Sequence, residues 1–216
     1  MNVDFFNEIT NYCDRHDVKL VAVSKKRSVE EIEVLHSLGQ NDFGENRIQE
    51  WVEKLEFTNP NLHWHLIGHI QTNKLKQVVQ KPFLIHSGDR IRLLDALEEL
   101  GLKRGINWDV LIQIKIAEEE SKHGFTFEDL YNDEILRTLS SYKYINFRGV
   151  MGMASQTDDF RQIRSEFQSL YHAFSHMQEV FADKSFSEIS MGMSNDYELA
   201  VEEGATIIRV GSAIFD

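Results

Sequence analysis

Short apolar segments alternate along the chain with longer stretches in which apolar residues recur at helical spacing. The short segments predict strands and the longer ones predict amphipathic helices, because side chains repeat every two residues in a strand and every 3.6 in a helix. Eight strands are expected, at residues 20–24, 42–44, 64–67, 83–86, 110–116, 148–153, 188–191 and 207–210.

The regular alternation of strands and helices predicts a parallel sheet, because parallel neighbours need a crossover segment between them. Eight units favour an α/β fold, a single (β/α)8 TIM-type barrel formed by residues 1–216 as one domain. A doubly wound open sheet is the alternative, but no Gly-rich dinucleotide turn follows the first strand. A helix is predicted to fill the last outer-helix position from its apolar residues Phe5, Phe6, Ile9, Tyr12 and Cys13.

Composition and charge limit the kinds of ligand and surface that the protein can bind. Hydrophobic residues form 42% of 216, and 35 acidic against 23 basic residues give a formal charge of −12. Such a surface repels nucleic acid and anionic lipid, so an anionic ligand must be held by local donors. No apolar run approaches the roughly 18 residues of a membrane span. The N-terminus lacks a secretion signal and Cys13 cannot pair within the chain, so we expect a soluble, cytoplasmic protein.

Functional residues of such barrels lie where strands end. Lys25 follows the first strand and shares a face with Val21 and Val23. If that face points inward, the apolar surroundings favour a neutral amine, the nucleophile that imine formation requires. A solvated lysine is the ordinary alternative. Glu45 and Asn46 follow the second strand and place a carboxylate and an amide at the same rim, unless Asn46 caps a helix.

The third strand raises the alternative of a metal site. His63 and His65 share a strand face, and His69 would be a third ligand. The segment contains no carboxylate, however, and Asp89 is the only convenient ligand at another strand end. We therefore expect packed, hydrogen-bonded histidines and no metal.

The last two strand ends predict an anion site. Gly192 permits a tight turn, Ser194 precedes a helix, and Gly211 with Ser212 offers main-chain N–H groups and a hydroxyl. The loops after strands seven and eight are the usual phosphate site of these barrels. Arg209 lies just before the second loop. Beside a pyridine ring, its guanidinium cannot accept a proton and would leave the ring nitrogen neutral. A salt bridge to a neighbouring helix is the alternative.

Six segments, taken together, resemble the pyridoxal phosphate homeostasis protein family, which has the fold of the alanine racemase N-terminal domain. They are residues 22–25, 43–46, 65–74, 121–125, 190–196 and 209–215. The resemblance implies pyridoxal phosphate as cofactor, held as an imine on Lys25. It also implies phosphate contacts from Ser194, Gly211 and Ser212, a place near the ring nitrogen for Arg209, and places beside the cofactor for Asn46 and Met193.

The function that the resemblance implies is cofactor homeostasis, as a carrier or regulator, rather than efficient catalysis. Apo-enzymes that need the cofactor are the expected partners, and a monomer is the expected state. A pyridoxal phosphate-dependent amino-acid racemase is the alternative. Racemisation needs a second acid–base group opposite the lysine, and no tyrosine is evident at a strand end. Lys122 is the next lysine to test as a cofactor ligand.

Overall fold

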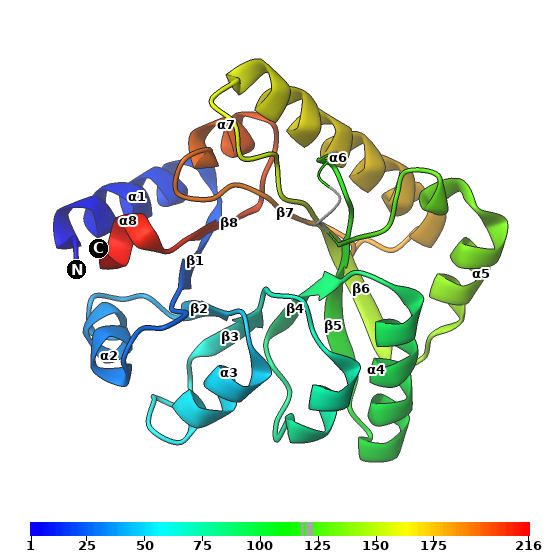
Figure 1. Ribbon diagram of the computed structural model, residues 1–216, viewed down its shortest axis with the longest axis horizontal. Coiled ribbons are helices and arrows are strands. Elements are labelled where there is room, and N and C mark those ends of the chain that lie inside the picture. Colours follow the sequence, from blue (N-terminus) through cyan, green and yellow to red (C-terminus); the bar gives the residue numbers. More distant parts are fainter. Residues whose placement is uncertain (118, 120–122) are drawn as a thin grey trace.

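Eight parallel strands close into a barrel in the computed structural model, which describes residues 1–117, 119 and 123–216. Each strand pairs with its sequence neighbours, and β8 closes on β1 (Figure 1). The strands are β1 (Lys19–Val23), β2 (Asp42–Glu45), β3 (His63–Leu66), β4 (Leu84–Gly88), β5 (Trp108–Gln113), β6 (Ile145–Met151), β7 (Glu188–Ser190) and β8 (Ile207–Val210). The predicted barrel and its eight strands are confirmed.

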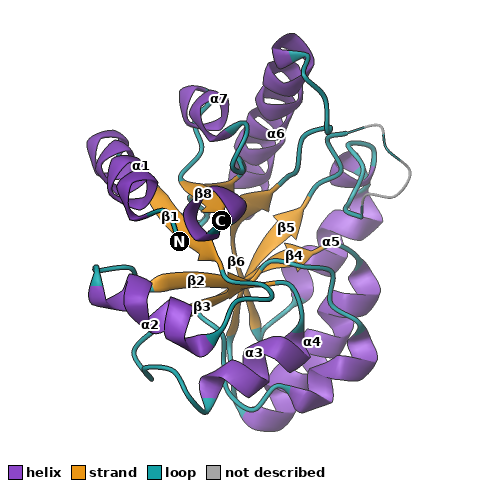
Figure 2. Ribbon diagram, turned by 60° about the vertical axis from the view of Figure 1, so that its left-hand side comes forward, coloured by secondary structure: helices purple, strands orange, loops and turns teal. Residues whose placement is uncertain are grey.

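Helices surround the barrel, as Figure 2 shows. The α-helices are α1 (Val3–His16), α2 (Val29–Ser37), α3 (Ile48–Leu55), α4 (Ile91–Arg104), α5 (Asp133–Ser141), α6 (Phe160–Phe181), α7 (Tyr197–Glu202) and α8 (Ser212–Phe215). Two short 3₁₀ helices complete the layer, η1 (Thr72–Gln77) and η2 (Asp129–Tyr131). Among the described residues, no helix has both the length and the apolar character to cross a bilayer.

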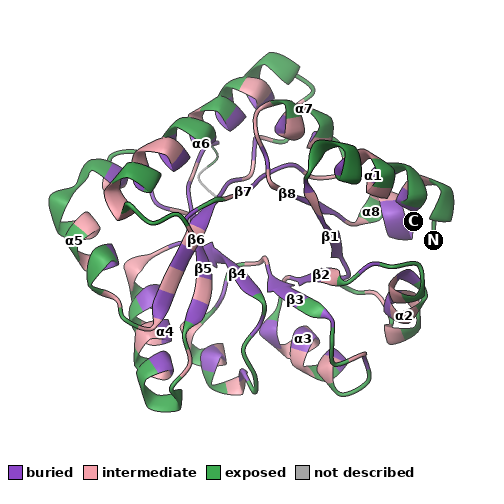
Figure 3. Ribbon diagram, turned by 180° about the vertical axis from the view of Figure 1, so that it is seen from behind, coloured by how far each residue is buried: buried purple, intermediate pink, exposed green. Residues whose placement is uncertain are grey.

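The core has two parts. The larger part lies between the outer faces of the strands and the inner faces of the helices, and buried residues follow the strands in Figure 3. The smaller part lies inside the barrel and comprises Val21, Leu84, Leu111, Met151 and Ile207. Side chains alternate along each strand, so the inward residues of β1 and β8 reach the space where the site is expected.

Helix α1 occupies the predicted outer position. Its Phe6, Ile9 and Cys13 are buried, and the main-chain N–H of Asn2 donates to the carbonyl of Ile214 at 2.7 Å. The chain ends therefore lie together in Figure 1, and α1 supplies the cover that the four-residue α8 cannot.

Two strand boundaries differ from the prediction by three residues, and one connection differs in type. Strand β5 ends at Gln113 rather than residue 116, because Ile114 leaves the sheet and forms a single bridge with Phe125. Strand β6 begins at Ile145, three residues earlier than expected. The β3–β4 connection holds η1 instead of an α-helix. Its six residues bury only Leu75 and have no side-chain N-cap, so little stabilises a longer helix there.

Candidate functional site

The predicted site residues gather at the carboxyl ends of four neighbouring strands: β7, β8, β1 and β2. Strand β1 pairs with β8 so that Val21 lies opposite Arg209, and it pairs with β2 so that Val23 lies opposite Gly44. Lys25 therefore follows a strand flanked by the strand of Arg209 and the strand that leads to Asn46. We call this end of the barrel the mouth.

Lys25 lies two residues after the end of β1 and is exposed, so the protein alone does not bury its amine, which matches the solvated lysine named above as the ordinary alternative. Its main chain is nevertheless held on both sides. Lys54 Nζ donates to the Ser24 carbonyl at 2.8 Å, and the Lys26 N–H donates to Glu50 Oε1. Lys25 thus presents an exposed side chain, while the main chain on both sides of it is held by hydrogen bonds.

A buried ion pair lies beneath this turn. Glu45 is fully buried instead of standing at the rim, and its Oε1 accepts from Lys54 Nζ at 2.6 Å and from Ser24 Oγ at 2.6 Å. Burial raises the pKa of Glu45, although the hydrogen bonds from Lys54 and Ser24 oppose the shift. Lys54 was not among the predicted residues, and its one sequence signal is the four-residue spacing from Glu50, with which it forms an ion pair at 2.9 Å.

Asn46 stands at the mouth, half-buried, in the turn after β2. It does not cap α3, whose N-cap is Arg47, so the capping alternative is wrong. The turn after β3 packs against the main chain of Asn46. A Cβ added to Gly68 would lie 2.4 Å from the Asn46 carbonyl oxygen. Glycine is required at this crossing, and the main chain of Asn46 is fixed by it.

The two loops predicted to bind an anion meet. Ser194 Oγ and Ser212 Oγ are 3.3 Å apart, which joins the loop after β7 to the loop after β8. Asp196 organises the first loop, because its Oδ1 accepts from the Met193 N–H at 2.5 Å. In the second loop, a Cβ on Gly211 would lie 3.0 Å from the Val23 carbonyl oxygen, so the backbones of β8 and β1 approach closely there.

Arg209 points into the barrel below these loops and is 4% exposed. Its Nη1 donates to Ser190 Oγ at 2.5 Å and its Nη2 to the Gly152 carbonyl at 3.1 Å. Both of these partners belong to or follow strands, Ser190 in β7 and Gly152 in the turn after β6. Burial lowers the pKa of Arg209 to about 10, and the guanidinium remains charged at neutral pH.

The three histidines of the metal alternative do not converge. His63 is exposed at the other end of the barrel, and His65 is fully buried inside it. In the part of the chain that the structure describes, the one group with ligand atoms within 4.8 Å of one another is His69, Asp89 and His123. Asp89 Oδ2 is 2.5 Å from His69 Nδ1, and Asp89 Oδ1 accepts from the Arg90 guanidinium.

The fold and the mouth define a class of protein, the barrels of the alanine racemase N-terminal domain type. A sequence profile described as "Alanine racemase, N-terminal domain" matches residues 6–216. The pyridoxal phosphate homeostasis protein of Haemophilus influenzae is 33% identical over 205 residues, 94% of this chain and 86% of that protein. The Helicobacter pylori protein of the same name is 36% identical over 209 residues, 95% and 90%. The chain belongs to the pyridoxal phosphate homeostasis protein family.

Solved structures agree with this placement. PipY of Synechococcus elongatus with pyridoxal phosphate bound is 32% identical with a TM-score of 0.82, and the match covers 93% of each chain. The same protein without the cofactor gives a TM-score of 0.86. Alanine racemase of Clostridium difficile has a TM-score of 0.73 at 14% identity, covering 95% of this chain and 54% of the racemase, which is a likeness of fold. Ser121 and Lys122, which belong to the segment 121–125 that resembles the family, lie outside the described residues.

Proposed function

We propose that the protein binds pyridoxal phosphate at the mouth and acts in the homeostasis of this cofactor as a carrier or regulator. The observation that carries the proposal is the meeting of Ser194 and Ser212 at 3.3 Å beside Gly211. Two hydroxyls and the main chain of two loops form a cradle of donors for a phosphate group. The usual phosphate site of such barrels lies in these two loops.

Lys25 is placed to bond the cofactor. Its amine would hold the cofactor as an imine, the linkage that a primary amine forms with an aldehyde with loss of one water. The pairing of β1 with β8 supports this role, because Lys25 follows the strand next to the loop of Gly211 and Ser212, and Lys54 and Glu50 bond to its neighbouring main-chain groups. Because Lys25 is exposed, the cofactor ring itself would supply the apolar cover that the protein does not.

Asn46, Met193 and Arg209 complete the proposed site. Asn46 and Met193 belong to the turns that flank the cradle, and both are half-buried. Arg209 would face the ring nitrogen. A guanidinium has no acceptor for a proton, so the ring nitrogen would stay neutral and the bound cofactor would be a weak electron sink. This arrangement favours holding the cofactor over driving carbanion chemistry with it.

The racemase alternative needs a second acid–base group at the mouth. All six tyrosines are described, and the contacts of four place them on the outer layer. Tyr142 donates to Asp95, Tyr12 packs against Tyr197, and Tyr131 stacks on His176. We infer that amino-acid turnover is at most weak.

The single, buried cysteine suits a reducing compartment, and we propose that the protein is cytoplasmic. We also propose that it is a monomer and that apo-enzymes needing the cofactor are its partners.

A visible spectrum tests the proposal. Protein mixed with pyridoxal phosphate should develop an imine band, and borohydride reduction followed by peptide mapping should locate the adduct on Lys25. The band should vanish in Lys25→Ala and persist in Lys26→Ala, the adjacent exposed lysine. A chromophore retained by Lys25→Ala, or a reduced adduct on Lys122, would contradict the assignment.

A further inference from the structure

A continuous chain of hydrogen bonds crosses the inside of the barrel and ends on Arg209. Arg209 Nη1 is 2.5 Å from Ser190 Oγ, and Ser190 Oγ is 2.8 Å from His86 Nδ1. His86 Nε2 is 2.8 Å from His65 Nδ1, and His65 Nε2 is 2.9 Å from Asp42 Oδ1. Ser190, His86 and His65 are fully buried. The chain therefore links four different strands, β8, β7, β4 and β3, to the start of β2.

When both imidazoles are neutral, the two ends of the chain fix the direction of every bond. A guanidinium only donates and an ionised carboxylate only accepts. Ser190 must therefore accept from Arg209 and donate to His86 Nδ1. This leaves the proton of His86 on Nε2, where it donates to His65 Nδ1. His65 then carries its own proton on Nε2 and donates to Asp42.

Both imidazoles are neutral in this arrangement, in agreement with their surroundings. Burial lowers the pKa of His65 and lowers that of His86 well below its usual value. Burial is the largest single influence on Asp42 and would raise its pKa, but the hydrogen bond from His65 and the electrostatic effects of His65, Lys19 and His63 together lower it. One positive and one negative charge thus terminate a neutral chain.

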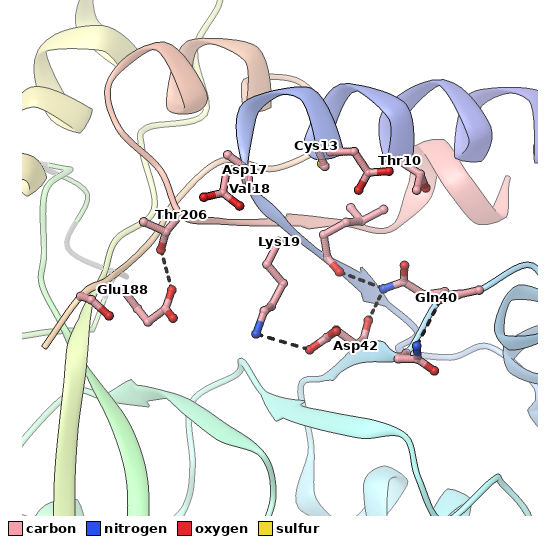
Figure 4. A pocket seen from close by; sticks show the side chains of 14 residues that line it. Thr10, Cys13, Asp17, Val18, Lys19, Gln40, Asp42, Glu188 and Thr206 are labelled. Atoms are coloured by element: carbon pink, nitrogen blue, oxygen red, sulfur yellow. Dashed lines mark hydrogen bonds and ion pairs between the residues drawn. The ribbon is translucent and has the colours of Figure 1, made fainter. Parts of the chain in front are cut away.

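Asp42 stands in a pocket at the end of the barrel opposite the mouth (Figure 4). Lys19 Nζ faces its Oδ1 at 3.9 Å, and His63 Nδ1 lies 3.4 Å from the same atom. Glu188 and Thr206 line the same pocket and bond to each other at 2.6 Å. The carboxylate is therefore held among charged partners near solvent, while the arginine that it balances lies deep in the barrel.

We propose that Ser190, His86 and His65 are positioning residues for Arg209, which hold one edge of its guanidinium through a one-way chain to Asp42. The N–H groups of Arg209 that do not donate to Ser190 and Gly152 would then be available to the ring nitrogen of the cofactor, and the chain has no proton to pass to that nitrogen. This inference rests on the proposed function, because it assigns the ring nitrogen to Arg209. The chemical class of the ligand is a neutral pyridine that accepts a hydrogen bond.

The chain can be tested without cofactor. Nitrogen-15 NMR of the full-length protein distinguishes imidazole tautomers, and His65 and His86 should both be neutral with the proton on Nε2. In Ser190→Ala, His86 loses its donor, and the Nδ1 resonance of His86 should move toward that of a nitrogen without a hydrogen bond. An Nδ1–H tautomer at either histidine would overturn the chain whether or not the protein binds pyridoxal phosphate.

The effect on the cofactor is tested with a matched pair of buried serines. Ser190→Ala should shift the maximum of the visible imine band and the pH at which the band titrates, because Arg209 loses the Ser190 hydroxyl that holds its Nη1 and keeps its bond to the Gly152 carbonyl. Ser87 is also fully buried, and its hydroxyl has no hydrogen-bond partner among the described residues, so Ser87→Ala should leave the band unchanged. Ser190→Thr, which keeps a hydroxyl, should restore the spectrum, and a thermal melt confirms that each variant is folded.

The outcomes separate the two proposals. Identical spectra for Ser190→Ala and Ser87→Ala would contradict the positioning role while leaving cofactor binding intact. A Ser190→Thr variant that behaves like Ser190→Ala would also contradict it, since a lost hydroxyl would not then be the cause. If no variant, nor the natural protein, forms the imine band, the proposed function fails, and the NMR experiment still decides whether the chain exists.

Discussion

At the scale of single residues, two lysines near the mouth have opposite surroundings. Lys25 is exposed on a fixed main chain, whereas Lys54 is 6% exposed and bonds to Glu45, Glu50 and the Ser24 carbonyl. A buried charge is stable only when paired and hydrogen-bonded. Lys54 therefore serves the structure under the mouth, and it leaves Lys25 as the amine that a ligand can reach.

Replacing Lys54 tests this division. Lys54→Met keeps the length of the stem but leaves the Glu45 carboxylate buried without its cation, so we expect a loss of about 3 kcal/mol in the free energy of unfolding at pH 7. The measurement is urea denaturation. Lys103→Met, an exposed helical lysine, is the control and should change stability by less than about 0.5 kcal/mol.

The pH dependence of Lys54→Met gives a second check. The pKa of Glu45 is already raised, and removing Lys54 removes hydrogen bonds that lower it. The folded variant then holds a proton that the unfolded chain has released, so its stability should fall as pH rises above about 4.5. A variant equally destabilised at pH 4.5 and pH 7 would show that the loss comes from packing rather than from charge.

At the scale of elements, the turns after neighbouring strands support one another. Gly68, after β3, lies against the main chain of Asn46, after β2. Gly68→Ala would force a Cβ to within 2.4 Å of the Asn46 oxygen, so the two turns must separate. We expect weaker retention of pyridoxal phosphate and a destabilisation of about 1–3 kcal/mol from overpacking. Equilibrium dialysis and urea denaturation measure the two effects.

Gly105 supplies the matched control for Gly68. It ends α4 at φ +65°, with nothing within 4 Å of an added Cβ. Gly105→Ala should cost about 1 kcal/mol through backbone strain alone. It should leave cofactor retention unchanged, because α4 leads into the start of β5, at the end of the barrel opposite the mouth. Equal cofactor loss in both variants would mean that lower stability, rather than the displaced Asn46 turn, weakens binding.

Helix α1 is the element that completes the outer layer, and Cys13 reports on it. Burial raises the pKa of the Cys13 thiol to about 12, so a thiol reagent should react slowly while α1 is docked. Ile9→Ala removes a fully buried side chain between α1 and the barrel and should cost about 2–5 kcal/mol. Cys13 labelling should then accelerate, whereas Val34→Ala, at a 47% exposed position of α2, should leave it slow. Unchanged labelling in Ile9→Ala would contradict local opening of α1.

The elements were predictable where their pattern is local, and the contacts beneath the site were not. Strand alternation and short apolar runs identified all eight strands, and the two serines singled out in the last loops, Ser194 and Ser212, meet in the structure. The connection η1 was mispredicted because too few of its residues are buried to hold an α-helix. The roles of Lys54 and His86 depend on partners 30 and 104 positions away, Ser24 and Ser190, and no local pattern encodes them.

At the scale of the whole molecule, the barrel separates charge along its axis. Arg209 lies under the mouth, Asp42 stands at the opposite end, and the surface carries a net charge of −12. A phosphate-bearing ligand is repelled by the surface as a whole. At the proposed site the donors of the mouth would hold it locally, and their arrangement depends on the closure of β8 onto β1.

The same internal chain makes the stability of the whole barrel depend on pH near neutrality. In the unfolded chain His65 and His86 would bind protons below about pH 6.5, whereas the folded protein keeps them neutral because their pKa values are lowered. The unfolded state thus binds more protons, and the free energy of unfolding should fall from pH 7 to pH 5, by up to about 1.4 kcal/mol per pH unit for each histidine.

Glu45, with its raised pKa, acts in the opposite direction, so the informative quantity is a difference between proteins that share it. His86→Gln keeps polar atoms in the barrel but cannot take up the proton. Its stability, measured by urea denaturation at pH 7 and pH 5, should fall by about 1–2 kcal/mol less than that of the natural protein. His172→Gln, at an exposed position of α6, should fall in parallel with the natural protein. Parallel loss in His86→Gln as well would mean that His86 is not held neutral in the fold, and the chain to Asp42 would then lack its central link.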